Sequence, residues 1–265
     1  MDRGAGGEQV LIVIDPIARH ADGESVRIAR DVLCAAVAGA KVCVLDRPQA
    51  MLHALTQRGS RRVVIIGGDR ALLRAVRMLY LSGELDEHPL GVVPVGPEAA
   101  VAVIRSLGVP ADAVLASRAV LSGPARPIDL LVDDAGGVVL GALGIPAPQP
   151  GPEPPGTRPW WRPARSTEAG SGALPAQRLR VEADGEVLTD GAQPGVQVSV
   201  TADGGLAAVE VRHSAGAAAV TARVSSVTVT GPGFSYRADT VNCGPARSRT
   251  WQVRPAALRL TVPVG

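Results

Sequence analysis

The chain of 265 residues is 46 % hydrophobic and 20 % charged, a balance that is typical of a folded globular protein and argues against a disordered one. Its formal net charge is only +2 and its acidic and basic residues are mixed, so nothing indicates nucleic acid as a partner. Three cysteines lack metal-ligand spacing, and no apolar stretch suits a signal peptide or a membrane span, so we expect a cytoplasmic protein.

Short apolar strands alternate with helical patterns in the first half of the chain. The strands are apolar throughout, which is typical of a parallel sheet covered on both faces. In chain order, strands are predicted at residues 10–14, 42–45, 62–66 and 90–93, and helices at 23–38, 49–57, 69–81 and 97–106. This alternation predicts a parallel-sheet α/β domain at residues 1–126.

The pattern changes from Ile128 onwards. Two strands, at residues 128–132 and 138–141, flank a turn, and residues 146–176 are so rich in proline and glycine that we expect a loop without regular structure. Only strand patterns follow, at residues 179–183, 186–189, 196–200, 206–212, 219–224, 226–230, 234–238, 250–253 and 258–262. We therefore expect an antiparallel β-rich domain at residues 127–265, with the Pro-rich loop 146–176 inside it.

Three loops at the carboxyl ends of predicted strands carry candidate binding residues, because ligands of open parallel sheets bind at those ends. They are Asp15-Pro16 after the first strand, Gly67-Gly68-Asp69 after the third, and the loop with Gly96 after the fourth. Backbone N–H groups at a glycine turn and at a helix N-terminus can bind phosphate. The same tripeptide is common where a strand simply turns into a helix capped by Asp69, and from the tripeptide alone we favour that interpretation.

The order and spacing of these motifs are similar to those of a known protein family. Ile14-Asp15-Pro16 stands where a known family has Asn-Pro, residues 67–71 where it has Gly-Gly-Asp-Gly-Thr, and residues 94–100 where it has Pro-x-Gly-Thr-Gly-Asn-Asp. Further matches lie at residues 107–110, 127–130, 202–206 and 251–260. The chain resembles the diacylglycerol kinase catalytic-domain family, bacterial lipid kinases related to sphingosine kinases and more remotely to NAD kinases.

This resemblance implies a Rossmann-like α/β domain followed by an antiparallel β-rich domain, and ATP-dependent phosphorylation of a lipid hydroxyl. It implies ATP and Mg²⁺ as cofactors, a nucleotide and a lipid as substrates, peripheral contact with a membrane and, since relatives often dimerise, a homodimer. By position it implies Asp69 as a catalytic residue and a metal at Asp203. The implied cofactor-binding residues are Asp15, Pro16, Gly67, Gly68, Asp69, Arg70 and Gly96.

The chain departs from the family where phosphoryl transfer needs positioning and charge stabilisation. Arg70 and Ala71 replace Gly-Thr in the glycine loop, and residues 97–100, Pro-Glu-Ala-Ala, replace Thr-Gly-Asn-Asp in the second loop. In the late segment that matches Asp-Gly-Glu, Val241 replaces the glutamate that would take the hydroxyl proton, and valine cannot accept a proton. Arg70 could bind a phosphate in two-pronged fashion, or lie in solvent, which we slightly favour.

Two further motifs have competing interpretations. An intact Asp184-Gly185-Glu186 lies too far upstream for the catalytic segment, and we interpret it as a hairpin turn in which Asp-Gly supplies positive φ. Trp160-Trp161 in the Pro-rich loop could cover an apolar ligand or dip into a membrane, although such a pair more often packs a loop onto the protein.

Three hypotheses follow for function. The chain is an active lipid kinase, an inactive member that still binds a nucleotide or a lipid as a regulatory protein, or an interaction protein that keeps only the fold. Gly67-Gly68-Asp69 favours the first two, and residues 97–100 together with Val241 count against the first. We favour an impaired kinase, because loss of one general base typically lowers a rate by about 10² to 10⁴ without abolishing it.

Overall fold

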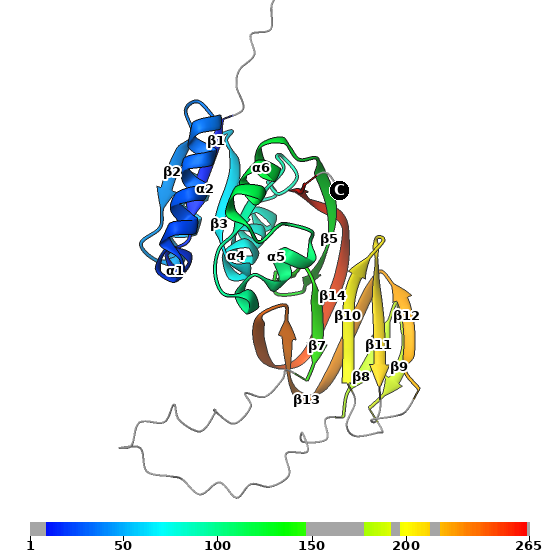
Figure 1. Ribbon diagram of the computed structural model, residues 1–265. Helices are drawn as coiled ribbons and strands as arrows, with labels where there is room; N and C mark the ends of the chain where they lie inside the picture. Colours follow the sequence, from blue (N-terminus) through cyan, green and yellow to red (C-terminus); the bar gives the residue numbers. More distant parts are fainter. Residues whose placement is uncertain (1–8, 147–177, 192–196, 213–217, 264–265) are drawn as a thin grey trace, which may run out of the picture.

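The computed structural model describes residues 9–146, 178–191, 197–212 and 218–263 (Figure 1). The predicted Pro-rich loop 146–176, with Trp160-Trp161, lies outside the described residues except for Pro146. The N-terminal part is a four-stranded parallel sheet in the order β2-β1-β3-β4. Its strands are β1 (Val10–Ile14), β2 (Lys41–Val44), β3 (Arg62–Gly67) and β4 (Gly91–Pro94).

Helices cover both faces of this sheet. The connection from β1 to β2 runs along the sheet in the opposite direction to the connection from β2 to β3. Because both crossovers are right-handed, α2 and α3 lie on opposite faces of the sheet. On these faces α2 packs against α6, and α3 packs against α4. The helices are α1 (Pro16–Ala21), α2 (Gly23–Ala36), α3 (Met51–Thr56), α4 (Asp69–Leu81), α5 (Ala102–Ser106) and α6 (Ala113–Ser122), with 3-10 turns η1 (Pro48–Ala50) and η2 (Glu98–Ala100). Only the edge strand β2 is poorly covered, since Val42 and Val44 are exposed.

Four helices differ from the sequence prediction, one of them the predicted helix 49–57, which is divided into η1 and α3. The predicted helix 97–106 is broken at Val101, whose φ of −124° is not helical, and it divides into η2 and α5. The helices α1 and α6 were not predicted, although each begins after an aspartate cap, Asp15 and Asp112 respectively. These caps were the available signal, since a side-chain oxygen that accepts the first free N–H groups marks a helix start.

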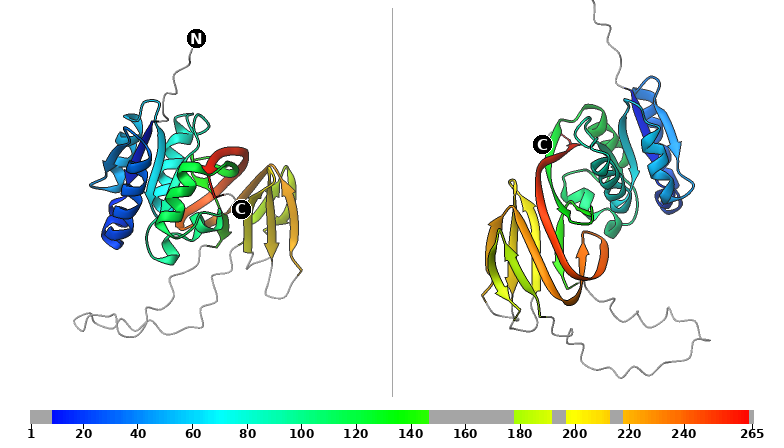
Figure 2. Two further views of the ribbon diagram at one scale, coloured as in Figure 1. Left: turned by 45° about the horizontal axis from the view of Figure 1, so that its top comes forward. Right: turned by 180° about the vertical axis from the view of Figure 1, so that it is seen from behind.

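The C-terminal part is a large antiparallel sheet, which confirms the predicted β-rich region. Its strand order is β12-β11-β10-β7-β13-β14-β5-β6, and the β8–β9 hairpin is attached to β13. The strands are β5 (Ala125–Asp133), β6 (Val138–Val139), β7 (Ala142–Ile145), β8 (Arg180–Ala183), β9 (Glu186–Asp190), β10 (Gln197–Asp203), β11 (Leu206–Arg212), β12 (Val220–Val224), β13 (Ser226–Ala238) and β14 (Val241–Thr261). Figure 2 shows this β-rich part beside the helix-covered sheet.

Two hydrophobic cores hold the molecule together. The first lies between the parallel sheet and its helices, and it also contains Leu130 of β5 and Leu258 and Leu260 of β14. The second lies within the β-rich part around the fully buried Trp251 and Phe234. The backbone continues this connection, because the N–H of Leu90, just before β4, donates to the carbonyl of Arg259 at 2.7 Å. The two sheets are therefore joined through β14, and the predicted boundary at 126/127 falls inside β5.

Candidate functional site

The glycine turn between β3 and α4 is built by close packing of three loops at the carboxyl ends of the parallel strands. A Cβ atom on Gly67 would lie 2.9 Å from the Cβ of Asp15 and of Ala71, and one on Gly68 would lie 2.7 Å from the carbonyl oxygen of Ala100. Both positions therefore need glycine, because the neighbouring backbone and short side chains fill the space of a side chain. The three predicted loops thus converge at one edge of the sheet.

Asp69 is the most buried charged residue of this edge, with 1 % of its surface exposed. Its carboxylate does not cap α4, although the local sequence favours that role. It accepts hydrogen bonds from the backbone N–H groups of Val103 and Ile104, each at 3.0 Å, and so caps α5. Burial raises the pKa of Asp69, while the N–H bonds from α5 act in the opposite direction.

Asp15 and Pro16 begin α1 directly above Gly67. One carboxylate oxygen of Asp15 accepts from the N–H of Ala18 at 3.4 Å, and the other is buried without a hydrogen-bond partner among the described groups. Burial raises the pKa of Asp15, and the nearby Arg74 guanidinium opposes this shift. Gly96, in the loop after β4, has φ of 143°, a backbone conformation that favours glycine.

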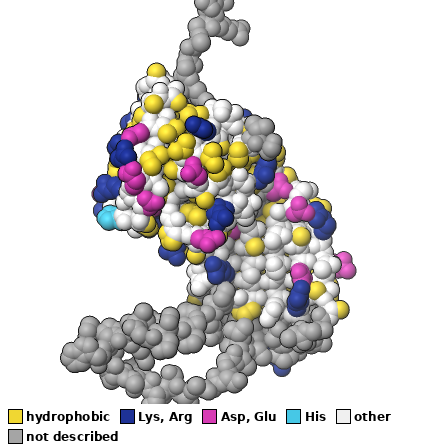
Figure 3. Space-filling view, in the orientation of Figure 1, with side chains coloured by type: hydrophobic (Ala, Val, Ile, Leu, Met, Phe, Trp, Pro, Cys, Tyr) yellow, Lys and Arg dark blue, Asp and Glu magenta, His cyan; other side chains and the backbone are white. Residues whose placement is uncertain are grey.

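Two charged side chains lie at the rim of this edge. Arg70 is exposed in the first turn of α4 and makes no hydrogen bond or ion pair with the described residues. Glu98 in η2 pairs with Arg105 of α5 at 2.8 Å, so the negative charge in the second loop is neutralised locally. Figure 3 shows side chains of both charges interspersed on the face it presents.

A turn from the far end of the chain completes the site. Asp239 lies in the turn between β13 and β14 with φ of 51°, and its carboxylate accepts N–H groups of Leu140, Gly141 and Ala142 at 2.8, 2.7 and 3.0 Å. Burial raises the pKa of Asp239, the three N–H groups oppose this shift, and the carboxylate of Asp69 adds to it. A Cβ atom on Gly141 would lie 2.9 Å from Oδ1 of Asp239 and 3.9 Å from Cγ1 of Val103. Because the N–H of Val103 binds Asp69, the fold brings the Gly-Gly-Asp turn and the late aspartate turn near each other.

Comparison with known proteins identifies the N-terminal part. A model of the diacylglycerol kinase catalytic domain matches residues 9–132. The matched part, residues 9–132, is therefore a domain of the diacylglycerol kinase catalytic-domain family. A comparison with curated proteins gave no match.

Solved structures extend the likeness over the whole fold. A proposed diacylglycerol kinase from Bacillus anthracis str. Sterne aligns with a TM-score of 0.74 at 14 % identity, covering 97 % of this chain and 98 % of that one. A second structure, a diacylglycerol kinase from the same organism, aligns with a TM-score of 0.70 at 14 % identity, covering 97 % of each chain. At this identity the likeness shows the fold.

In the Asp-Gly-Glu segment that the sequence resemblance implies, Asp239 stands at the aspartate position and Val241 at the glutamate position. Val241, at the glutamate position, is 39 % exposed and has no group that can take a proton. Sequence reasoning did not single out Asp239, although it stood at the aspartate of the matched Asp-Gly-Glu segment. Its environment depends on residues 97 to 99 positions away along the chain, which the sequence does not reveal.

The upstream Asp184-Gly185-Glu186 is a hairpin turn, as predicted. Asp184 and Gly185 have φ of 47° and 88° between the paired strands β8 and β9. The Asp184 carboxylate accepts from the N–H groups of Ser225 and Ser226 and from the Ser225 hydroxyl, and the bonds from Ser225 lower the pKa of Asp184. The segment therefore fastens the β8–β9 hairpin to the start of β13.

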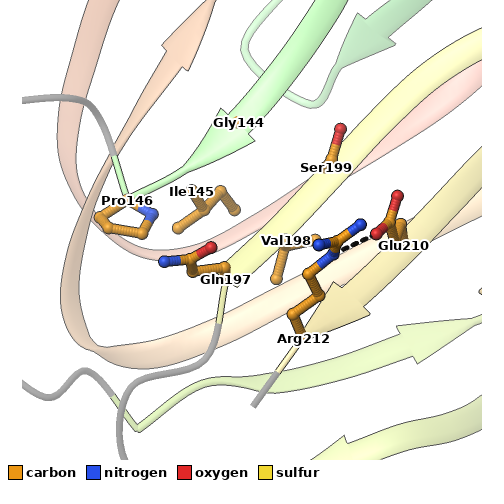
Figure 4. A pocket seen from close by; sticks show the side chains of 8 residues that line it. All are labelled: Gly144, Ile145, Pro146, Gln197, Val198, Ser199, Glu210 and Arg212. Carbon is orange, nitrogen blue, oxygen red and sulfur yellow. Dashed lines mark hydrogen bonds and ion pairs between the residues drawn. The ribbon is translucent and has the colours of Figure 1, made fainter. Parts of the chain in front are cut away.

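The predicted metal residue, Asp203, and a surface hollow lie in the β-rich part, whereas the glycine turn lies in the parallel sheet. Asp203 forms an ion pair with Arg223 at 2.8 Å, and within the described ranges no group of three or more His, Cys, Asp or Glu side chains could hold a metal. A hollow of about 470 Å³ on β7, β10 and β11 is lined by polar and apolar side chains, with Glu210 and Arg212 paired at its wall (Figure 4). It contains none of the predicted site residues. No helix in the described parts of the chain is long and apolar enough to cross a membrane.

Proposed function

We propose that this diacylglycerol kinase-like protein binds a nucleotide at the Gly67–Asp69 turn, and that its ATP-dependent phosphorylation of a lipid hydroxyl is strongly reduced. Membership of the family supports the nucleotide and the lipid as ligands. The retained Gly67-Gly68-Asp69 turn at the carboxyl end of β3 supports the position of the nucleotide phosphates.

Arg70 supports phosphate binding in place of the glycine of the family. It lies at the N-terminus of α4, a helix of 13 residues whose dipole favours an anion at that end. Its guanidinium is exposed and has no partner among the described residues, so it is available to bind a phosphate through two parallel hydrogen bonds. The pairing of Glu98 with Arg105 weakens the repulsion that Glu98 would exert on a phosphate.

The reduced transfer rests on one observation, the way in which the fold uses two of the carboxylates of the site. The oxygens of Asp69 bind N–H groups of α5, and those of Asp239 bind the N–H groups of residues 140–142. A carboxylate held in this way is poorly placed to take a proton from a lipid hydroxyl, and Val241 supplies no substitute. In kinases Mg²⁺ neutralises charge on the transferred phosphate. The oxygens of Asp69 and Asp239 are already used, so among the three aspartates of the site one oxygen, on Asp15, has no partner among the described groups. A single oxygen is a poor Mg²⁺ site, so we expect nucleotide binding that does not depend on Mg²⁺.

The test is phosphorylation of diacylglycerol in detergent micelles by the purified protein and by Val241→Glu, with Val241→Gln as the matched control that adds the same bulk without a base. We expect transfer by the wild-type protein to lie about 10² to 10⁴ below that of an active kinase, and Val241→Glu to exceed Val241→Gln at least about tenfold. Wild-type turnover of about 1 to 100 s⁻¹, the usual range of kinases, would refute the proposed impairment.

A further inference from the structure

The turn between β10 and β11 carries Asp203, the residue at which the family resemblance implies a metal. Asp203 pairs with Leu206 across the turn, and Gly204 and Gly205 have φ of 58° and 78°. Two consecutive glycines with positive φ form the tight turn that fits the twist of a hairpin. The turn therefore exposes the carboxylate and the backbone carbonyl of Asp203 to whatever cation lies beside it.

Arg223 of the neighbouring strand β12 lies beside both oxygens. Its Nη1 donates to Oδ2 of Asp203 at 2.8 Å, and its Nη2 donates to the Asp203 carbonyl oxygen at 2.8 Å. A carboxylate and a backbone carbonyl are the oxygen donors that Ca²⁺ and Mg²⁺ use in proteins. The rigid fork of the guanidinium satisfies both at once, which a single ammonium group would do less well.

The other acid that contacts this turn already uses both of its oxygens. This acid is Asp129 of β5, whose Oδ2 accepts from the N–H of Gly205 at 2.6 Å and whose Oδ1 accepts from the N–H of Ala256 at 2.8 Å. In the described part of the chain, no group of three His, Cys, Asp or Glu side chains surrounds Asp203. Two oxygens from one residue are far fewer than the six to eight ligands of a Ca²⁺ site.

We propose that the Arg223 guanidinium is the built-in cation of the Asp203 turn, so that this protein holds the turn without the divalent metal that the family resemblance implies. The inference rests on the contacts of Asp203 and does not depend on the proposed nucleotide binding. It assigns Arg223 a structural role: the guanidinium joins β12 to the end of β10 across β11, where a metal would join only the groups of the turn.

The test is thermal unfolding of the full chain in EDTA, in Mg²⁺ and in Ca²⁺, with NaCl added to keep the ionic strength constant. For the wild-type protein we expect a melting temperature that changes by less than about 1 °C among the three conditions. We expect Arg223→Ala to lower it by about 2–4 °C, in the range of a small stability change for a chain of this size, and Asp203→Asn/Arg223→Ala to lower it no further.

The vacated oxygens supply the decisive observation. In Arg223→Ala, about 20 mM Ca²⁺ should recover none of the lost melting temperature, because the two oxygens of Asp203 are too few for a Ca²⁺ site. Arg212→Ala is the matched control, because Arg212 pairs with Glu210 on the same sheet through side chains alone, and its loss should be smaller than that of Arg223→Ala. A wild-type protein destabilised by EDTA, an Arg223→Ala protein as stable as wild type, or recovery of Arg223→Ala by Ca²⁺ would each overturn the proposal.

Discussion

Replacement of Asp69 by alanine tests whether its hydrogen bonds to α5 stabilise the folded protein. The change removes the acceptor of the N–H groups of Val103 and Ile104 and leaves them unpaired, Ile104 at a fully buried position. An unpaired buried N–H costs about 1–3 kcal/mol, and loss of a helix cap about 0.5–2 kcal/mol. Release of a carboxylate that burial disfavours returns part of this. We therefore expect Asp69→Ala to lower the free energy of unfolding by about 2–4 kcal/mol, or the melting temperature by about 5–10 °C.

Two control variants show whether the loss of stability in Asp69→Ala comes from its hydrogen bonds to α5. The free energy of unfolding of all three variants is measured in urea at pH 7. Asp69→Asn keeps one acceptor oxygen and has no charge to desolvate, so it should cost at most about 1 kcal/mol. Asp112→Ala removes the cap of α6, whose carboxylate accepts from Val114 and Leu115 at an exposed site, and should cost about 1 kcal/mol. The reasoning fails if Asp69→Ala is no more destabilising than Asp112→Ala.

Three further predictions follow from the packing and the carboxylates. Gly68→Ala should lower the free energy of unfolding by about 1–3 kcal/mol, because its Cβ would lie 2.7 Å from the Ala100 carbonyl oxygen, and chemical denaturation would show it. Gly144→Ala, where no atom lies within 4 Å of the new Cβ, should stay within about 0.5 kcal/mol of wild type; a larger loss would contradict the open geometry of β7. The pKa values of Asp15, Asp69 and Asp239 are raised in the folded protein. Between the ordinary aspartate pKa and these raised values, the folded protein therefore binds more protons than the unfolded chain. These three groups make the free energy of unfolding fall as pH rises through that window. Urea unfolding from pH 3.5 to 7 should show that the free energy of unfolding falls less, or rises more, with pH for Asp239→Asn than for wild type, and equal slopes would disprove the assignment.

The sequence predicted most of the fold because its signals are local. The strand at residues 10–14 and the helix at 69–81 have the predicted limits, since an unbroken apolar run and a helical period need no information from elsewhere. Strands β13 and β14 were predicted as shorter pieces because glycine and proline interrupt their patterns. In the structure these residues lie near shifts of register, at Thr230/Phe234 and Arg254/Leu258, and the strands continue past them.

The site was less predictable because its hydrogen bonds join distant parts of the chain. Asp69 stands where local sequence predicts a cap for α4, yet it caps α5, more than 30 residues away, because the loops after β3 and β4 pack together. The resemblance implies a metal at Asp203, but Arg223, 20 residues away, donates hydrogen bonds to its carboxylate and carbonyl oxygens. A motif predicts which residues stand at a site, but not which of their donor and acceptor atoms the fold has already used.

The most direct test of the proposed function is calorimetric titration of the protein with ATP, once in Mg²⁺ and once in EDTA. We predict a Kd below about 1 mM that changes less than about threefold between the two conditions and rises at least about tenfold in Arg70→Ala, but not in Arg118→Ala, an exposed arginine of α6. Binding that needs Mg²⁺ would contradict the role given to Arg70. The absence of binding at about 5 mM ATP would contradict the nucleotide site itself.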